Sequence, residues 1–131
     1  MIFIDSNVPM YLVGAEHPNK TRAISMLDDL ITRGERLVTD VEVLQEILHR
    51  YTAINRPDAI QSAFDALLDV VDDVFRVRLE DIQEAKTIVL GRHGVSARDA
   101  LHVAIMRANQ VVRIATFDAG YDRVPGIERL P

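Results

Sequence analysis

Short apolar runs alternate along this chain with longer segments whose apolar residues recur every three or four positions. The short runs are rich in β-branched residues and predict strands at residues 2–4, 37–39, 74–77 and 111–115, with a weaker fifth near Ile127. The longer segments are typical of amphipathic helices. Because each helix carries the chain back across the sheet, the strands that it joins are expected to run parallel.

Five helices are predicted in the longer segments. Two follow from apolar stripes: Leu44, Ile47, Leu48 and Tyr51 in one, and Ala97, Leu101, Ala104, Ile105 and Ala108 in the other. Turn residues mark the ends of three more predicted helices, over residues 21–33, 58–69 and 81–92. The sequence therefore predicts an α/β fold, a three-layer α/β/α sandwich with a central, mainly parallel sheet of four to five strands, in a single domain over residues 1–131.

Composition excludes several chemistries. The 131 residues include no cysteine, which rules out a disulfide framework, a thiolate zinc site and a cysteine nucleophile. The chain opens without a basic stretch followed by an apolar run, and no segment approaches the roughly 20 apolar residues of a membrane span, so we expect a cytoplasmic protein. The net charge of −5 opposes nucleic-acid binding by charge alone, and such a role requires a metal ion or a local basic patch.

Acidic residues gather where the predicted strands end. Asp5 follows the first strand, Asp40 the second, and Asp118 the fourth, while Asp99 begins the helix before that fourth strand. Open parallel sheets bind ligands at the carboxyl ends of their strands. Carboxylates about 4 Å apart repel by roughly 4 kcal/mol at an effective dielectric of 20, so a cluster binds protons or cations. Oxygen ligands of this kind favour Mg²⁺ or Mn²⁺.

Each acid also has a purely structural interpretation. Asp5 and Asp118 suit helix N-caps, and Asp99 lies three residues after Ser96, as in a capping box with Asp in place of Glu. Glu46 lies nearly opposite the first apolar stripe, so periodicity alone predicts a solvated side chain. The histidines at 17, 49, 93 and 102 lack the i, i+4 pair of a helical zinc site, which favours structural or exposed roles.

Four segments together form a more specific pattern: MIFIDSNV, LVTDVEVLQEIL, SARDALHVA and IATFDAGYDRVPGIERL. With them the whole chain resembles PIN-domain ribonucleases, and especially the VapC-type toxins of prokaryotic toxin–antitoxin modules. The resemblance implies four catalytic, metal-binding acids: Asp5, Glu46, Asp99 and Asp118. It also implies Asn7 and Thr116 as neighbours of the site and Glu42 as the alternative to Glu46, whereas Asp40 is an addition that either tunes the site or caps a helix.

The resemblance implies an endoribonuclease that uses Mg²⁺ or Mn²⁺ to hydrolyse RNA phosphodiester bonds, with a cognate antitoxin protein and a homodimeric assembly. Two alternatives stay open. A PIN-like protein-binding module keeps the fold without cleaving RNA. A phosphoacceptor signalling domain also places acids at strand ends, but it needs a late lysine, and none follows Lys86. Five basic residues are candidates for contacts to the RNA backbone: Lys20, Arg22, Arg92, Arg98 and Arg123.

Overall fold

The computed structural model describes residues 1–92 and 94–131, and within these ranges five strands form one sheet. They are β1 (Ile2–Ile4), β2 (Leu37–Asp40), β3 (Asp73–Phe75), β4 (Arg113–Ala115) and β5 (Glu128–Leu130). Their spatial order is β3-β2-β1-β4-β5, and every neighbouring pair is parallel. The predicted α/β class and parallel sheet are confirmed.

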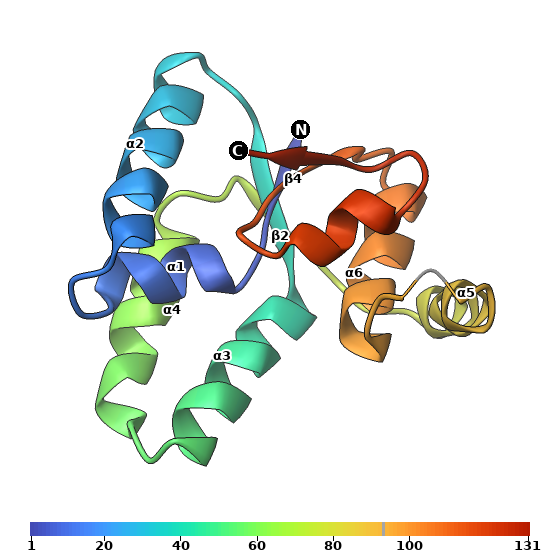
Figure 1. Cartoon of the computed structure of the whole chain (residues 1–131), viewed down its shortest axis with the longest axis horizontal. Helices are drawn as coiled ribbons and strands as arrows, with labels where there is room; N and C mark the ends of the chain where they lie inside the picture. Colours follow the sequence, from blue (N-terminus) through green and yellow to red (C-terminus); the bar gives the residue numbers. More distant parts are fainter. Residues whose placement is uncertain (93) are drawn as a thin grey trace.

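Helices flank this sheet on both sides. The described residues form α1 (Asn7–Val13), α2 (Pro18–Thr32), α3 (Val41–Ala53), α4 (Ile60–Leu68), α5 (Leu79–Leu90) and α6 (Ala97–Ala108), with short 3₁₀ helices η1 (Pro57–Ala59) and η2 (Ala119–Arg123). Figure 1 shows α1, α2 and α4 on one side of the sheet, α5 and α6 on the other, and α3 extending from the end of β2. No helix in the described ranges has the length and apolar character of a membrane span.

Two local differences from the sequence prediction have clear causes. Helix α1 was not predicted. Its Pro9 lies in the first turn, a position that tolerates proline because the amide there has no partner within the helix. The fourth strand starts at Arg113 rather than at residue 111. The amide of Val111 instead donates to the carbonyl of Met106 and closes the end of α6.

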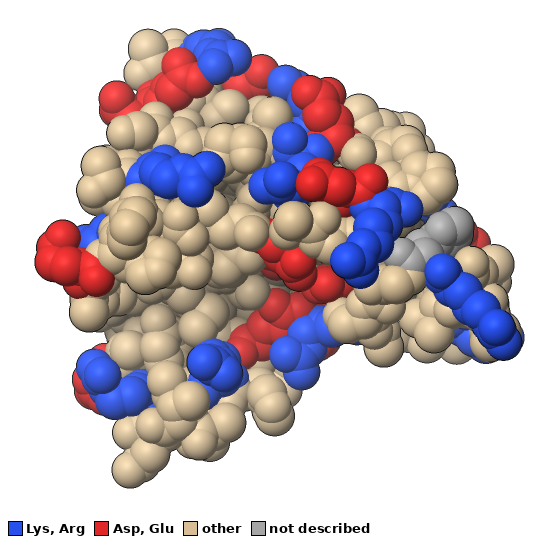
Figure 2. Space-filling view, viewed as in Figure 1, with Lys and Arg blue, Asp and Glu red and all other residues tan. Residues whose placement is uncertain are grey.

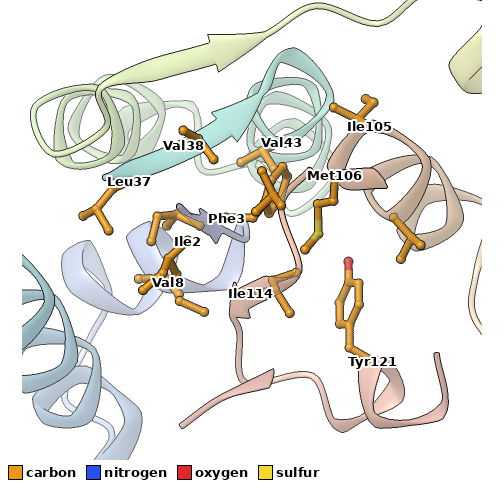
Figure 3. Close-up of a cluster of buried hydrophobic side chains, with 14 of the residues drawn as sticks. Ile2, Phe3, Val8, Leu37, Val38, Val43, Ile105, Met106, Ile114 and Tyr121 are labelled. Carbon is orange, nitrogen blue, oxygen red and sulfur yellow. The ribbon is translucent and has the colours of Figure 1, made fainter. Parts of the chain in front are cut away.

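The central strands are anchored in a core that lies on both faces of the sheet. Ile2, Phe3 and Ile4 of β1 are each fully buried, as expected for a strand covered by helices on both sides. Figure 3 shows side chains of β1 packed in one cluster with side chains of β2, β4 and α6. Tight packing of this kind fixes the positions of the residues that follow these strands.

The register between β1 and β4 determines which residues leave the sheet together. Ile4 is paired with Ala115, and the amide of Asp5 donates to the carbonyl of Ala115 at 3.1 Å. Asp5 and Thr116 therefore emerge side by side. The chain order runs outward from β1 in one direction to β2 and in the other to β4, which makes this pair the switch point where open α/β sheets bind ligands.

Candidate active site

A cavity of about 940 Å³ opens at the carboxyl edge of β1 and β4. The four acids proposed from the sequence, Asp5, Glu46, Asp99 and Asp118, all line it. Its apolar wall comes mainly from α5. Figure 2 shows acidic side chains along the hollow between the two halves of this face, with basic side chains beside them. The structure thus brings four acids from separate segments around one space.

Asp5 is held by donors on both carboxylate oxygens. Its Oδ1 accepts the amide of Ser6 at 2.7 Å, and its Oδ2 accepts the Thr116 hydroxyl at 2.6 Å and Asn7 Nδ2 at 3.4 Å. The side chain is 4% exposed. Burial raises its pKa from 3.8 to about 6, with a further contribution from the charge of Glu46, against the opposing effects of His102 and Thr116. Asp5 is therefore a positioned carboxylate whose negative charge is only partly compensated. The N-cap of α1 is Ser6, so the capping interpretation of Asp5 is wrong.

Asn7 and Thr116 hold this carboxylate in place through hydrogen bonds. Asn7 Nδ2 donates to the Thr116 hydroxyl at 2.9 Å, and Asn7 Oδ1 accepts the amide of Phe117 at 3.2 Å. The Thr116 hydroxyl also accepts the amide of Asp118 at 3.1 Å. One hydroxyl group thus connects the segment after β1 with the segment that carries the last acid. Both residues lie beside the site, where the resemblance suggested them.

Glu46 is buried, and the periodicity-based prediction of a solvated side chain is wrong. Ser6 and His102 cover the face of α3 on which it lies. Its Oε2 accepts the Ser6 hydroxyl at 2.6 Å, and its Oε1 lies 2.7 Å from His102 Nε2. Burial by itself would raise the pKa of Glu46, but the hydrogen bond and charge of His102 and the hydrogen bond from Ser6 outweigh it and lower the pKa. Glu46 is therefore an ionised carboxylate.

His102 is the residue that the sequence interpretation missed. It is fully buried on α6, with Nδ1 2.7 Å from Asp40 Oδ2 and Nε2 2.7 Å from Glu46 Oε1. Burial lowers the pKa of the imidazole, but the two carboxylates reverse that effect and raise it well above its ordinary value. Both ring nitrogens then donate. Its spacing of three residues from Asp99 was the available clue, because residues three apart share a helix face.

Asp40 both caps a helix and contacts the site. Its Oδ1 accepts the amide of Val43 at 2.9 Å at the start of α3, and its Oδ2 is the partner of His102. The side chain is fully buried. The added acid of this sequence thus lies behind the cavity wall, where it pairs with a histidine. Of the other histidines, the one at position 93 lies outside the described residues.

Asp99 and Asp118 complete the acidic lining. The amide of Asp99 donates to the hydroxyl of its N-cap Ser96, while its carboxylate Oδ1 accepts the hydroxyl of Tyr121 at 3.0 Å. Burial raises the pKa of Asp99, the nearby charge of Asp118 adds to this, and the Tyr121 hydrogen bond opposes it. Asp118 is exposed and caps η2 through the amide of Gly120 at 2.8 Å. Capping and lining the cavity are therefore compatible for Asp118.

A basic side chain stands at the mouth of the cavity. Arg98 Nε lies 3.7 Å from Glu42 Oε1 and 3.8 Å from Glu46 Oε1, and its side chain is 44% exposed. Lys86 of α5 also lines the cavity. Glu42 is partly exposed there, and burial raises its pKa. Of the five basic residues proposed to contact RNA, Arg98 is the one among the described residues that lines this cavity.

The side-chain atoms around this cavity that could ligate a metal suit a hard divalent cation. One atom each of Asp5, Glu46 and His102 lie within 4.8 Å of one another, but both nitrogens of His102 already face carboxylates. Carboxylate oxygens are the remaining ligands, and they are the ligands that Mg²⁺ and Mn²⁺ prefer. Burial raises the pKa of Asp5 and of Asp99, and the charges of neighbouring carboxylates add to this; a bound cation would oppose both effects. These residues therefore fit such an ion.

The chain belongs to the PIN domain family, whose sequence model matches residues 2–127, and the suspected resemblance is confirmed. It is 53% identical to ribonuclease VapC13 of Mycobacterium tuberculosis over 130 residues, 99% of each chain. It matches the crystal structure of M. tuberculosis VapC20, described as a sarcin-ricin loop cleaving toxin, with a TM-score of 0.79, 21% identity and full coverage of both chains. It also matches a toxin–antitoxin complex from Klebsiella pneumoniae with a TM-score of 0.68 and 10% identity, over 97% of this chain and 95% of that one. The two structural matches show the shared fold.

Proposed function

We propose that this chain, as one domain over residues 1–131, is an endoribonuclease that depends on Mg²⁺ or Mn²⁺ and acts as the toxin of a toxin–antitoxin pair. The observation that carries the proposal is the placement of four acids, from four separate segments, around one cavity at the sheet edge. The name of its 53% identical relative, a ribonuclease, supports RNA as the substrate. We also propose that the protein acts in the cytoplasm, where a toxin of this kind would meet cellular RNA.

The acidic residues have distinct parts in this proposal. Asp5, Glu46, Asp99 and Asp118 hold the ion, which when bound polarises the phosphate and lowers the pKa of water. Thr116 orients the carboxylate of Asp5 by its hydrogen bond. Hydrolysis forms a bond between a water oxygen and phosphorus and breaks the bond between phosphorus and a ribose oxygen, which takes up a proton. No covalent bond to the protein is needed.

Tyr121 and Arg98 assist these acids. The Tyr121 hydroxyl fixes the direction of the Asp99 carboxylate. Arg98 and Lys86 at the cavity supply positive charge for the RNA backbone, which offsets part of the acidic surroundings. The chain has no tryptophan, three tyrosines and four phenylalanines, so recognition rests more on RNA shape and accessible loops than on base stacking.

The apolar wall of the cavity supports an antitoxin as the protein partner. Ile82, Val89 and Leu90 of α5 are 49%, 41% and 71% exposed, and they face the same space as the acids. A segment with apolar side chains and one Arg or Lys would cover this wall and place its charge among the carboxylates. Leu90→Gln, which removes apolar surface without adding negative charge, is expected to weaken antitoxin binding and to change RNA cleavage little. We also propose a homodimer, which light scattering on the chain without antitoxin would test.

Cleavage of total cellular RNA tests the enzymatic proposal. The chain without antitoxin is expected to cut RNA with millimolar Mn²⁺ and to stop when a chelator is added. Asp5→Asn and Asp118→Asn are expected to abolish cutting while the chain stays folded. Asp28→Asn, at an exposed acid of α2, is the matched control and is expected to cut normally.

Two outcomes would favour the alternative functions. An unchanged RNA ladder in Mn²⁺ with antitoxin absent would support a PIN-like protein-binding module. Formation of a stable acyl phosphate on treatment with a small phosphodonor would support a phosphoacceptor domain. Full activity in Asp5→Asn or Asp118→Asn would remove that residue from the set of ligands.

A further inference from the structure

A continuous chain of hydrogen bonds runs behind the acidic wall of the cavity. It begins at the amide of Val43, passes through Asp40 and the ring of His102, and reaches Glu46. Asp40 and His102 are fully buried, and neither lines the cavity. This series of hydrogen bonds therefore ends in the site, although Asp40 and His102 cannot touch a substrate there.

The arrangement leaves little freedom to any of its members. Asp40 is fixed at the N-cap of α3, so its second oxygen has a defined direction toward the ring. The ring belongs to α6, the helix that also carries Asp99, so the chain of hydrogen bonds ties α3 to α6. Glu46 then has His102 on Oε1 and the Ser6 hydroxyl on Oε2.

Other roles for His102 are less consistent with this geometry. A ligand to a cation needs a free nitrogen lone pair, and both nitrogens here lie 2.7 Å from carboxylate oxygens. A histidine that only filled the core would need no alignment with two acids. Long side chains such as Glu lose considerable rotamer freedom when they are fixed, so a rigid partner reduces the entropy that is lost when Glu46 takes up an ion.

We propose that His102, held by Asp40, is a positioning residue that fixes the Glu46 carboxylate for the divalent ion. This inference rests on the proposed function, since it concerns the same site. Each carboxylate oxygen has two lone pairs, so Glu46 can accept its hydrogen bond from His102 and still contribute to the ion. Partners that orient a ligand in this way typically change metal affinity by about ten- to a hundredfold when they are removed.

Two substitutions separate the two hydrogen bonds of the ring. In His102→Gln, the side-chain amide nitrogen has the reach of Nε2 and keeps a donor for Glu46 while losing the one for Asp40. In His102→Asn, the shorter amide has the reach of Nδ1 and keeps a donor for Asp40 while losing the one for Glu46. Each variant removes one buried hydrogen bond, so their stabilities are expected to fall by comparable amounts.

Titration with Mn²⁺, followed by calorimetry on the full chain, is the direct test. Both variants lose the charge of the ring alike, so the difference between them reports the hydrogen bond to Glu46: we expect His102→Asn to bind Mn²⁺ about ten- to a hundredfold more weakly than His102→Gln. Thermal unfolding without metal checks that both variants are folded. Equal Mn²⁺ affinity in the two variants would overturn the inference, because a purely structural role depends on both bonds alike. Failure of the unaltered chain to bind Mn²⁺ would overturn the metal-dependent function as well, which makes the two failures distinguishable.

A second measurement needs no variant and applies if neither one folds. The ring proton on Nε2 of His102 is buried and hydrogen-bonded, so it is expected to give a resolved signal in the NMR spectrum of the unaltered chain. Mg²⁺ withdraws electron density from Glu46 and is expected to move that signal, while the ring of the exposed His17 responds little. A His102 signal that ignores saturating Mg²⁺ would contradict the proposed contact with the ion-binding carboxylate.

Discussion

The hydroxyl of Thr116 donates to the carboxylate of Asp5 at 2.6 Å, although 111 positions separate the two residues in the chain. The parallel register of β1 and β4 creates this contact, because Ile4 and Ala115 are paired immediately before them. The same hydroxyl accepts hydrogen bonds from Asn7 and from the amide of Asp118. One side chain therefore links two of the four acids of the site.

Replacing Thr116 with valine is expected to destabilise the chain by about 1 kcal/mol or somewhat more, because the partly buried donors of Asn7 and Asp118 lose their acceptor. Loss of the hydroxyl also removes a hydrogen bond that lowers the pKa of Asp5, so that pKa is expected to rise further. Denaturant unfolding and RNA cleavage measure the two effects. Thr116→Ser keeps the hydroxyl and serves as the control. Equal stability of the valine and serine variants would show that the hydrogen bonds contribute nothing.

The raised pKa of Asp5 predicts an unusual pH dependence of stability without metal. Between about pH 4 and pH 6, the folded chain keeps a proton on Asp5 that the unfolded chain has released. The contribution of Asp5 to the free energy of unfolding therefore falls as pH rises through this window, by up to about 3 kcal/mol. Denaturant unfolding across this pH range, with chelator present, should show that fall in the unaltered chain relative to Asp5→Asn. A constant difference between the two proteins would contradict the pKa shift.

The fold could be predicted because its signals are local. Runs such as residues 2–4 and 37–39 are short and rich in β-branched residues, and the helices between them carry regular apolar stripes. Three acids of the site, Asp5, Asp99 and Asp118, were also accessible to pattern reasoning, since they lie at strand or helix ends. Parallel strands bring such ends to the same edge whatever the remaining details are.

The remaining features of the site depend on contacts between distant segments. Periodicity assigns Glu46 to the solvent side of α3, and only the packing of Ser6 and His102 over that face shows otherwise. The role of His102 was missed for the same reason, because its partners are 56 and 62 positions away. A sequence pattern describes a helix face, whereas the structure shows what covers that face.

Addition of metal is expected to stabilise the fold. At about 100 times its dissociation constant, Mg²⁺ or Mn²⁺ should raise the free energy of unfolding by roughly 2.7 kcal/mol if it binds only the folded chain. Thermal unfolding with Mn²⁺ and with chelator measures this increase. Asp99→Asn should reduce it, because that substitution removes a carboxylate from the cavity lining. A melting temperature that is the same with Mn²⁺ and with chelator would count against a metal site.

Arg98 is expected to have opposite effects on the two ligands of the cavity. Its guanidinium lies within 4 Å of both Glu42 and Glu46, where it competes with a cation for the same negative charge. Arg98→Gln should therefore tighten Mn²⁺ binding, by about two- to fivefold, since exposed ion pairs contribute up to about 1 kcal/mol.

The same substitution removes a positive charge that we propose faces the RNA backbone, so KM for RNA should rise while kcat changes little. The salt dependence of RNA binding should also weaken, by about 0.7 in the logarithmic slope for one lost phosphate contact on a single strand. Arg98→Lys, which keeps the charge, is the control and should retain most of that slope. An unchanged KM and slope in Arg98→Gln would show that this arginine balances the charge of the acids and does not contact RNA.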